Sequence, residues 1–253
     1  MNHGFSRKSV LITGAGGGIG GATALAFAAA GARLALTDID QAAGAETEAL
    51  MQATGGTALF VRTDVICAAE VEALGKATVA AYGRLDCAFN NAGIEIEHMR
   101  ITECAESTFD SIMAVNVKGV WLCLECELAQ MALQDGGAIV NTASVAGLKA
   151  APKMATYAAS KHAVLGLTKT AAVEFARKKV RVNAVCPGVI RTAMYARALK
   201  ADPAIASRVA AMHPLRRFGE TDEVAAAVLW LCSDAASFVT GHAQAVDSGF
   251  GVI

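Results

Sequence analysis

Dense charge of one sign is missing from this chain. Charged residues make up 18% of its 253 residues, and the formal net charge is −1. Binding to nucleic acid requires a concentrated cationic surface, so we expect no nucleic-acid partner. The densest basic run, RKKVR at residues 177–181, is typical of a solvated helix end, where cations complement the helix dipole.

Long apolar runs are also missing. No stretch approaches the ~20 consecutive apolar residues that a membrane-spanning helix needs, so we expect no membrane partner. Arg7 and Lys8 precede the apolar residues Val10–Ile12, as in a secretory leader, but the apolar run breaks at Thr13–Gly18. We therefore expect a cytoplasmic protein.

The seven cysteines form no recognisable framework. They are odd in number and scattered through expected core segments, which is typical of free thiols in a reducing compartment. Cys123 and Cys126 form a C-x-x-C pair, but neither a second pair nor a histidine cluster accompanies them. Their spacing only places both on one helix face, so we expect no metal site.

Short apolar or β-branched runs alternate along the chain with longer, alanine-rich stretches. This alternation predicts an α/β fold whose parallel sheet is covered by helices on both faces. The strand runs are almost continuously apolar, as expected when both faces of a sheet are buried. The expected strands are Val10–Thr13, Arg33–Thr37, Ala58–Val61, Leu85–Phe89, Ala138–Thr142, Val180–Val185 and Ala243–Val246. The expected helices are Ile19–Ala30, Gln41–Thr54, Ala68–Ala81, Thr108–Leu133, Ala155–Lys178 and Asp222–Ser233.

No linker, charge block or repeat divides the sequence, so residues 1–253 are expected to form a single domain. The one long irregular stretch is Gly188–Thr221, after the sixth strand. Long connections in compact domains are often lids or binding loops, and we expect this one to cover the substrate.

A glycine-rich turn follows the first expected strand directly. The sequence TGAGGGIG at residues 13–20 lies between that strand and a helix, where glycines let the backbone approach a pyrophosphate. The N-terminus of the helix offers unpaired N–H groups to the anion. The candidate cofactor contacts in this turn are Gly14, Gly16, Gly17, Gly18, Ile19 and Gly20.

Asp38 ends the second expected strand, 18 positions after Gly20. Its carboxylate is placed to accept hydrogen bonds from the ribose hydroxyls of the adenosine. The alternative is a helix cap, which Asp40 could supply equally well. A 2′-phosphate would be repelled by Asp38, and no arginine or lysine stands at Gly17 or Ile39 to compensate. NAD is therefore expected rather than NADP.

Tyr157 and Lys161 are four residues apart in a helix-forming stretch, which places phenol and ammonium on one helix face. A free tyrosine has a pKa near ~10 and is a poor base at neutral pH. A nearby cation stabilises the phenolate and lowers that pKa. By itself the pair could equally be a surface lysine beside a half-buried tyrosine.

Two further polar residues strengthen this interpretation. Ser144 follows the expected strand Ala138–Thr142, at the end of the strand where ligands bind in parallel sheets, and could hydrogen-bond a substrate oxygen. Asn116 lies inside the expected helix Thr108–Leu133, although asparagine is an indifferent helix former. A polar role toward the cleft or a water chain would explain it; the alternative is an exposed asparagine.

Taken together, these residues resemble the short-chain dehydrogenase/reductase family. The matching pieces are TGAGGGIG at 13–20, Asp38, Asp64-Val65, NNAG at 90–93, Asn116, Ser144, YAASK at 157–161 and PGVIRT at 187–192, in the family's order over essentially the whole chain. The resemblance implies that Tyr157 is the general acid/base and that Lys161 lowers its pKa and holds the nicotinamide ribose. It also implies that Ser144 binds the substrate oxygen and that Asn116 anchors a proton-relay water.

The resemblance also assigns the rest of the cofactor site. It implies that Asp64 and Val65 fix the adenine. The residues that it implies to line the cofactor are Asn90, Asn91, Ala92 and Gly93. The residues that it implies to hold the nicotinamide carboxamide are Pro187, Gly188, Ile190 and Thr192.

The family's architecture gives a further expectation. The resemblance implies a single-domain Rossmann-type doubly wound fold with a seven-stranded parallel sheet, a cofactor half of about 1–140, a catalytic half of about 141–253, and a homotetramer. One residue departs from the family pattern: Ser248 stands where a glycine is common. A serine with positive φ there would cost about 1 kcal/mol.

The expected pocket walls are mainly apolar and offer no convincing clamp for a carboxylate or phosphate. We therefore expect a small apolar or alicyclic secondary alcohol, or its ketone. Glu95, Glu97 and His98 could bind a polyol instead, or form a solvated loop. The expected walls are Ile94, Ile96, His98, Met99, Val145, Ala146, Leu148, Met154, Val189, Met194, Tyr195 and Leu199.

Two other functions stay open. One is a 3-oxoacyl thioester (acyl-carrier-protein) reductase, which usually uses NADP and basic docking residues; Asp38 argues against the first requirement. The other is a catalytically idle NAD-binding regulator or scaffold. Such a protein is expected to lose part of the constellation, whereas Asn116, Ser144, Tyr157 and Lys161 are all present.

Overall fold

The sheet of the protein has seven strands in the order β3-β2-β1-β4-β5-β6-β7, and all neighbouring strands are parallel. The computed structural model of the protein describes residues 4–134, 136–192 and 211–253. The strands are β1 (Ser9–Thr13), β2 (Arg33–Thr37), β3 (Thr57–Phe60), β4 (Cys87–Asn90), β5 (Gly137–Thr142), β6 (Val180–Pro187) and β7 (Ala243–Val246). The predicted doubly wound, seven-stranded parallel sheet is confirmed.

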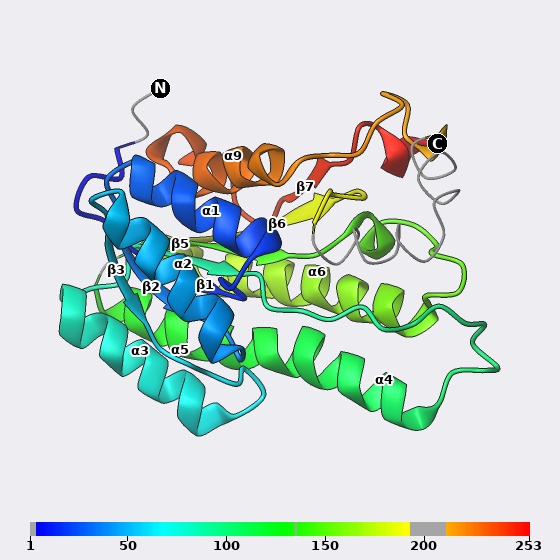
Figure 1. Cartoon of the computed structure of the whole chain (residues 1–253), viewed down its shortest axis with the longest axis horizontal. Helices are drawn as coiled ribbons and strands as arrows, with labels where there is room; N and C mark the ends of the chain where they lie inside the picture. The colour runs from blue at the N-terminus through cyan, green and yellow to red at the C-terminus, as the bar shows by residue number, and fades with distance from the viewer. Residues whose placement is uncertain (1–3, 135, 193–210) are drawn as a thin grey trace.

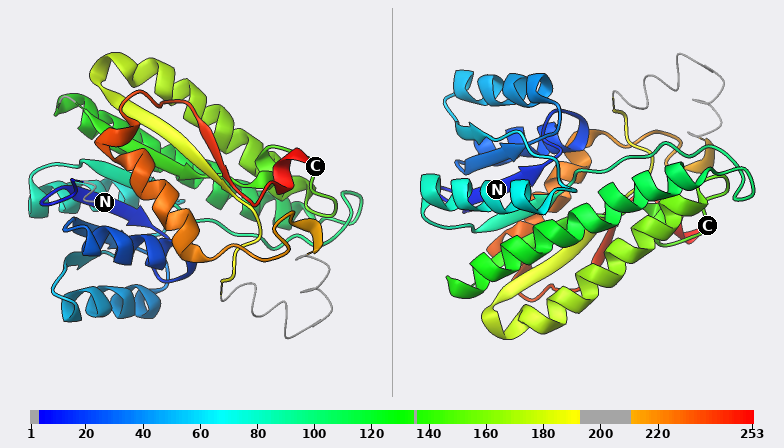
Figure 2. Two further views of the ribbon diagram at one scale, coloured as in Figure 1. Left: turned by 90° about the horizontal axis from the view of Figure 1, so that it is seen from above. Right: turned by 90° about the horizontal axis from the view of Figure 1, so that it is seen from below.

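Helices cover both faces of this sheet (Figures 1 and 2). The helices α1 (Gly18–Ala29), α2 (Gln41–Ala53) and α9 (Thr221–Cys232) lie on one face, where α1 packs against both α2 and α9. The helices α3 (Ala68–Tyr82), α5 (Val120–Leu133) and α6 (Ala155–Phe175) lie on the other. The short helix α4 (Glu106–Met113) packs against α6.

The apolar strands divide their side chains between two cores. In β1, Val10 and Ile12 belong to the core beneath α1 and α9, whereas Leu11 belongs to the core beneath α3, α5 and α6. All three are buried. This explains why the strands are apolar at consecutive positions and not at alternate ones.

The predicted helix Thr108–Leu133 is wrong as a continuous α-helix. The helical segment starts at Glu106, and a π-helical turn, η1 (Ala114–Gly119), separates α4 from α5. Gly119 packs so closely on Val65 that a Cβ would come within 2.8 Å of its Cγ2. Asn116 lies inside η1, and its side-chain amide hydrogen-bonds to the backbone of Ile94. Such long-range contacts override the local sequence periodicity that predicts a continuous α-helix. Turns of π-helix are frequent at functional sites.

Part of the expected substrate loop Gly188–Thr221 can be placed. Ile190 forms a parallel bridge with Gly219, so the two described ends of the loop lie together. Met194, Tyr195 and Leu199 lie outside the described residues. Among the described residues, there is no helix with both the length and the apolar character needed to cross a membrane. The seven cysteines are free thiols, and Cys67, Cys104 and Cys126 are only half-buried.

Candidate active site

The sheet order reverses beside β1, whose two neighbours are β2 and β4. Ligands of open α/β sheets bind at such a switch point, outside the carboxyl ends of the strands. The residues singled out in the sequence follow these strand ends: the glycine-rich turn after β1, Asp38 after β2, NNAG at the end of β4, Ser144 after β5 and PGVIRT at the end of β6. One edge of the sheet therefore brings them together.

The glycine-rich turn is crowded by backbone. Gly14 has a φ of +65°, and a Cβ there would lie 2.9 Å from the Cα of Ala92. A Cβ at Gly20 would overlap the carbonyl oxygen of Gly14. Helix α1 begins at Gly18, and the residue before it, Gly17, has no side chain to cap the helix. The first N–H groups of α1 are thus left for a ligand.

Asp38 is directed at this turn. One of its oxygens, Oδ2, accepts the backbone N–H of Gly16 at 2.9 Å, and Oδ1 accepts that of Asp40 at 3.0 Å. The cap of α2 is Asp40, which accepts from the N–H groups of Ala42 and Ala43. The alternative that Asp38 caps the helix is therefore wrong, and its carboxylate stays beside the glycine-rich turn.

The NNAG segment joins the ends of β1 and β4. The hydroxyl oxygen of Thr13 accepts the backbone N–H groups of Asn91 and Ala92, both at 3.0 Å. The Asn91 side chain donates to the carbonyl oxygen of Gly14 at 3.1 Å. A Cβ at Gly93 would lie 3.5 Å from the ammonium nitrogen of Lys161. The segment thus runs from the glycine-rich turn to the predicted acid/base pair.

Asn90 behaves differently from its neighbours. Its side chain is buried in the core, where Nδ2 donates to Glu127 Oε2 at 2.9 Å and to Asn141 Oδ1 at 3.0 Å. Asn141 in turn donates to the Thr168 hydroxyl at 2.9 Å. The side chain of Asn90 is thus engaged within the core, and its predicted contact with the cofactor stays a prediction.

Asp64 and Val65 follow β3. Asp64 Oδ1 accepts the N–H of Ile66 at 3.2 Å, and the N–H of Asp64 donates to Glu70 Oε2 at 2.7 Å. Val65 is buried against the π-turn at Gly119. The contacts of both residues fix the shape of this segment.

Asn116 is fully buried, so the alternative of an exposed asparagine is wrong. Its Oδ1 accepts the N–H of Ile94 at 2.8 Å, and its Nδ2 donates to the carbonyl oxygen of Ile94 at 2.9 Å. The same Nδ2 lies 3.2 Å from the hydroxyl of Ser160, next to Lys161 in the chain. Asn116 thereby fixes the segment that follows NNAG.

Ser144, Tyr157 and Lys161 meet at the carboxyl end of β5. Ser144 caps the 3₁₀ turn η2 (Val145–Gly147) by accepting the N–H of Ala146 at 3.1 Å, and its hydroxyl lies close enough to the Tyr157 side chain to act on its pKa. Lys161 is buried, and its Nζ donates to the carbonyl oxygen of Thr142 at 2.8 Å. The alternative of a surface lysine is therefore wrong.

Burial sets the protonation of this pair. Burial raises the pKa of Tyr157 to about 12; the neighbouring Ser144 hydroxyl opposes the shift, and the charge of Glu95 adds to it. Burial also lowers the pKa of Lys161 to about 8. The sequence predicts that a nearby cation lowers the pKa of Tyr157; the pKa is instead raised, because desolvation of the buried phenol is the largest cause of its shift.

Glu97 was missed as a structural residue of the site. It is fully buried, so a solvated loop is wrong for this position. Its Oε2 accepts the backbone N–H of Tyr157 at 3.0 Å, and its Oε1 accepts the hydroxyl of Thr156 at 3.3 Å. His98 is exposed and pairs with Glu95 at 3.4 Å. The only sequence signal is that Met154, before α6, has no oxygen with which to cap the helix.

The turn after β6 packs against Asp247 and His213. A Cβ at Gly188 would lie 3.0 Å from both Asp247 Cα and His213 Nε2, so a larger residue would crowd both neighbours. The N–H of Val189 donates to the buried His213 at 3.3 Å. Thr192 reaches the glycine-rich turn, where its Cγ2 would lie 3.6 Å from a Cβ at Gly18.

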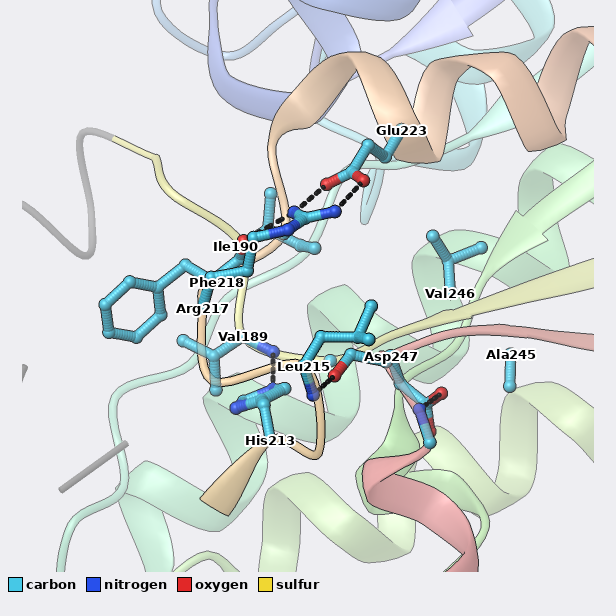
Figure 3. Close-up of a pocket in the computed structure, with 14 residues that line it drawn as sticks. Val189, Ile190, His213, Leu215, Arg217, Phe218, Glu223, Ala245, Val246 and Asp247 are labelled. Carbon is cyan, nitrogen blue, oxygen red and sulfur yellow. Dashed lines mark hydrogen bonds and ion pairs between the residues drawn. The ribbon is translucent and has the colours of Figure 1, made fainter. Parts of the chain in front are cut away.

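A cavity of about 320 Å³ lies behind this turn (Figure 3). Val189 and His213 line one side, and the ion pair of Arg217 with Glu223 lies beside Ile190. Ser144, Tyr157 and Lys161 are not among its lining residues. The cavity is therefore distinct from the place where the predicted acid/base pair meets.

Ser248 lines this cavity. It has a φ of +60°, so the expected positive φ is confirmed. Its hydroxyl oxygen accepts the backbone N–H of Leu215 at 3.0 Å. A glycine could not make this bond, which offsets part of the conformational cost.

Known sequences resemble this chain over its whole length. The family model described as enoyl-(acyl carrier protein) reductase matches residues 14–251. A 2,5-dichloro-2,5-cyclohexadiene-1,4-diol dehydrogenase from Sphingobium indicum is 43% identical over 251 residues, or 98% of this chain and 99% of that protein. A cyclohexanol dehydrogenase from Acinetobacter sp. strain SE19 is 38% identical over 250 residues, or 99% of this chain and 97% of that protein.

Solved structures agree with these matches. Levodione reductase superposes with a TM-score of 0.94 at 40% identity, covering 98% of this chain and 99% of the other. NAD⁺-bound xylitol dehydrogenase gives 0.94 at 35% identity, covering 97% and 100%, and ElxO with NADP bound gives 0.93 at 33% identity, covering 97% and 99%. The chain therefore belongs to the short-chain dehydrogenase/reductase family, a family of oxidoreductases.

Proposed function

We propose that this protein is an NAD-dependent dehydrogenase of secondary alcohols, with Tyr157 as its general acid/base. The observation that carries the proposal is the meeting of Ser144, Tyr157 and Lys161 at the sheet edge that also holds the glycine-rich turn. A phenol, a hydroxyl and an ammonium at one point are the groups needed to move a proton to or from a substrate oxygen. The same edge fits a dinucleotide, because its turn is crowded by backbone and Asp38 faces it.

The proton steps follow from the pKa values. Tyr157, whose pKa burial raises to about 12, holds its proton at neutral pH and can donate it to the oxygen of a ketone. Oxidation of an alcohol needs the phenolate instead, and Lys161 is the neighbouring cation that would stabilise it. Ser144 would hydrogen-bond the same substrate oxygen. When bound, NAD supplies the acceptor for the hydride.

Asn116 is proposed as a supporting residue of this site. Both ends of its amide bind Ile94, and we propose that the proton-relay water binds the backbone carbonyl oxygen of Asn116. The other proposed cofactor contacts keep their predicted roles: the glycine-rich turn for the pyrophosphate, Asp64 and Val65 for the adenine, and residues 187–192 for the nicotinamide.

The preference for NAD rests on Asp38. Its carboxylate lies 2.9 Å from Gly16 N, beside the proposed pyrophosphate site, and would repel a 2′-phosphate. Relatives with known structures bind NAD⁺ in one case and NADP in another, so the residue and not the family decides. Initial rates with both cofactors test this: NAD should be favoured by at least tenfold, about 1.4 kcal/mol.

An alicyclic alcohol or its ketone is the proposed substrate. The support is the names of the relatives, which act on a cyclohexadiene diol and on cyclohexanol, together with the buried apolar residues Val145 and Ala146 beside Ser144. A panel of cyclohexanol, cyclohexanediols, linear secondary alcohols and polyols, assayed with NAD by NADH absorbance, tests the class. Higher kcat/KM for polyols such as xylitol would contradict it.

A 3-oxoacyl thioester reductase is the second candidate, because the matching family model carries an acyl-carrier-protein description. Docking of an acidic carrier needs free basic residues. Arg181, in the densest basic run, instead donates to the carbonyl oxygens of Leu231 and Ser233 at 2.7 and 3.0 Å. Turnover of acetoacetyl thioesters with NADPH would favour this candidate, and NADH binding without turnover of any compound would favour an idle scaffold.

We also propose a homotetramer in the cytoplasm, with α5 and α6 pairing between subunits. A groove between these helices is lined by Trp121, Leu128, Leu167 and Phe175, and Trp121 is 49% exposed. Light scattering after gel filtration tests the assembly. The division into a cofactor half of about 1–140 and a catalytic half of about 141–253 is likewise proposed.

A further inference from the structure

We propose that Glu97 is a positioning residue for Tyr157, holding the first turn of α6 from the segment that follows NNAG. The inference rests on the proposed function, because it concerns the placement of the proposed acid/base. Glu97 lies 60 positions before Tyr157 in the chain, yet its carboxylate binds the backbone of that residue.

The first turn of α6 has donors that need an acceptor. An α-helix leaves its first N–H groups unpaired, and a capping side chain normally binds the N–H of the second or third helical residue. Tyr157 is the third residue of α6, and Met154 at the capping position has no side-chain oxygen. Glu97 Oε2 accepts the Tyr157 N–H at 3.0 Å, and Oε1 accepts the Thr156 hydroxyl at 3.3 Å. Glu97 thus acts as the N-terminal cap of α6, although it lies in another part of the chain.

Burial and charge favour this contact. Glu97 is fully buried, and a buried carboxylate is costly unless it is paired or hydrogen-bonded. The positive end of the α6 dipole supplies the compensation. Charge-assisted hydrogen bonds of this kind are about twice as strong as neutral ones. The carboxylate therefore fixes the helix end more firmly than a neutral side chain would.

The same segment is anchored at its other end by Asn116. Asn116 binds both backbone groups of Ile94, at 2.8 and 2.9 Å, and the N–H of Glu97 donates to Glu95 Oε1 at 2.9 Å. Residues 94–97 therefore form a short brace between the π-turn that contains Asn116 and the helix turn that contains Tyr157. Loss of Glu97 would release Tyr157 at a helix end, where helices fray.

Catalysis is sensitive to such placement, since a displacement of about 1 Å can cost roughly 10²-fold in rate. We expect Glu97→Ala to lower kcat with cyclohexanol and NAD by about 10- to 100-fold, with the dissociation constant of NADH unchanged by fluorescence titration. Glu97→Gln keeps one carbonyl oxygen for the Tyr157 N–H and should recover most of kcat. Hydrogen exchange of the peptide covering 154–161 should speed up in Glu97→Ala.

Gln134→Ala is the matched control. Gln134 also ties the end of a helix to distant backbone, because it accepts the Leu85 N–H at 3.0 Å, but it lies between α5 and β5, before the start of a strand and away from the catalytic edge. It should lower the melting temperature and leave kcat unchanged. If Glu97→Ala lowers the melting temperature as much as Gln134→Ala and changes neither kcat nor exchange at 154–161, the positioning role is wrong.

Tyr157→Phe separates the two proposals. If Tyr157→Phe keeps its turnover, the proposed function fails, whatever Glu97 does. If Tyr157→Phe is inactive and Glu97→Ala is normal, only the positioning role fails. Should Glu97→Ala not fold, Glu97→Met carries the test, because it fills a similar volume and has no oxygen to accept the Tyr157 N–H. Faster exchange at 154–161 with a reduced kcat supports the role, and wild-type values of both overturn it.

Discussion

The ammonium nitrogen of Lys161 lies 5.5 Å from the centre of the Tyr157 ring, but it donates its hydrogen bond to the carbonyl oxygen of Thr142, at 2.8 Å. The lysine is thus held in place by β5 and not by the phenol. Ser144, two residues after the same strand, acts on the phenol and opposes the rise of its pKa. The carboxyl end of β5 therefore positions both the cation and the hydroxyl that lie near the phenol.

Removing the phenolic hydroxyl tests the proposed acid/base directly. Tyr157→Phe should lower kcat by about 10²- to 10⁴-fold, since only the transferable proton is lost. The dissociation constant of NADH, measured by fluorescence, should stay within about twofold because the ring remains, a change below about 0.5 kcal/mol. Near-normal turnover in this variant would contradict the assignment even with the fold intact.

The charge of Glu95 should be visible in the pH profile. Burial raises the pKa of Tyr157 to about 12, and the negative charge of Glu95 adds to the rise. Glu95→Gln keeps an oxygen to accept the Glu97 N–H but removes the charge, so the phenolate becomes easier to form. The limb of alcohol oxidation that rises with pH should therefore move to lower pH. Glu46→Gln, an exposed change on α2, should leave the profile in place.

Glu127 should make the stability depend on pH. Burial raises the pKa of this carboxyl from its ordinary value of 4.5 to about 8, although the hydrogen bond from Asn90 opposes the shift. Between these values the folded protein binds more protons than the unfolded chain, so stability is greatest below pH 4.5 with respect to this group and falls as pH rises toward 8. Each unit of difference corresponds to about 1.4 kcal/mol.

The matching variant is Glu127→Gln, which cannot ionise. Its melting temperature should fall less steeply than that of the wild type between pH 5 and pH 9. A protonated Glu127 also has a donor for the buried Asn90 Oδ1, which finds no partner among the described residues. If the melting temperatures of the wild type and of Glu127→Gln change in parallel across this pH range, the pKa of Glu127 does not differ between the folded and unfolded states.

Asp38 should decide cofactor choice. Hydrogen bonds to charged groups contribute about 1.5–3 kcal/mol, so Asp38→Ala should raise the KM for NAD by about 10- to 100-fold. The KM for NADP should fall at the same time because a repulsive charge is gone. Asp40→Ala removes the α2 cap two residues away; it should lower the melting temperature while the ratio of rates with NAD and NADP stays constant.

Local sequence patterns predicted most of the fold. The bounds of β2 and β7 agree with the expected Arg33–Thr37 and Ala243–Val246, because short apolar runs between turn residues define them. The helix Thr108–Leu133 was predicted as continuous, since its periodicity is local and does not register the contact of Asn116 with Ile94, 22 residues earlier. Distant contacts cannot be read from spacing.

In the candidate site, too, local spacing was predicted correctly and distant contacts were missed. Tyr157 and Lys161 share a helix turn, so their proximity follows from spacing. Glu97 was missed because its contact with Tyr157 spans 60 residues and depends on how the segment after β4 passes the start of α6. The direction of the Tyr157 pKa shift was missed for a related reason: burial is a property of the packed molecule, and the sequence offered only the charge of a neighbour.

Ser248 offers a balance of two opposing effects that substitutions can separate. A non-glycine residue in the left-handed region costs about 1–2 kcal/mol, and the hydrogen bond from Leu215 N to Ser248 Oγ contributes about 0.5–1.5 kcal/mol. Ser248→Gly removes both and should change the free energy of unfolding by less than about 1 kcal/mol. Ser248→Ala keeps the strain and loses the bond, so it should destabilise by about 1 kcal/mol. Urea midpoints of the three proteins measure this; a Ser248→Ala variant as stable as the wild type would mean that the Leu215 bond contributes nothing.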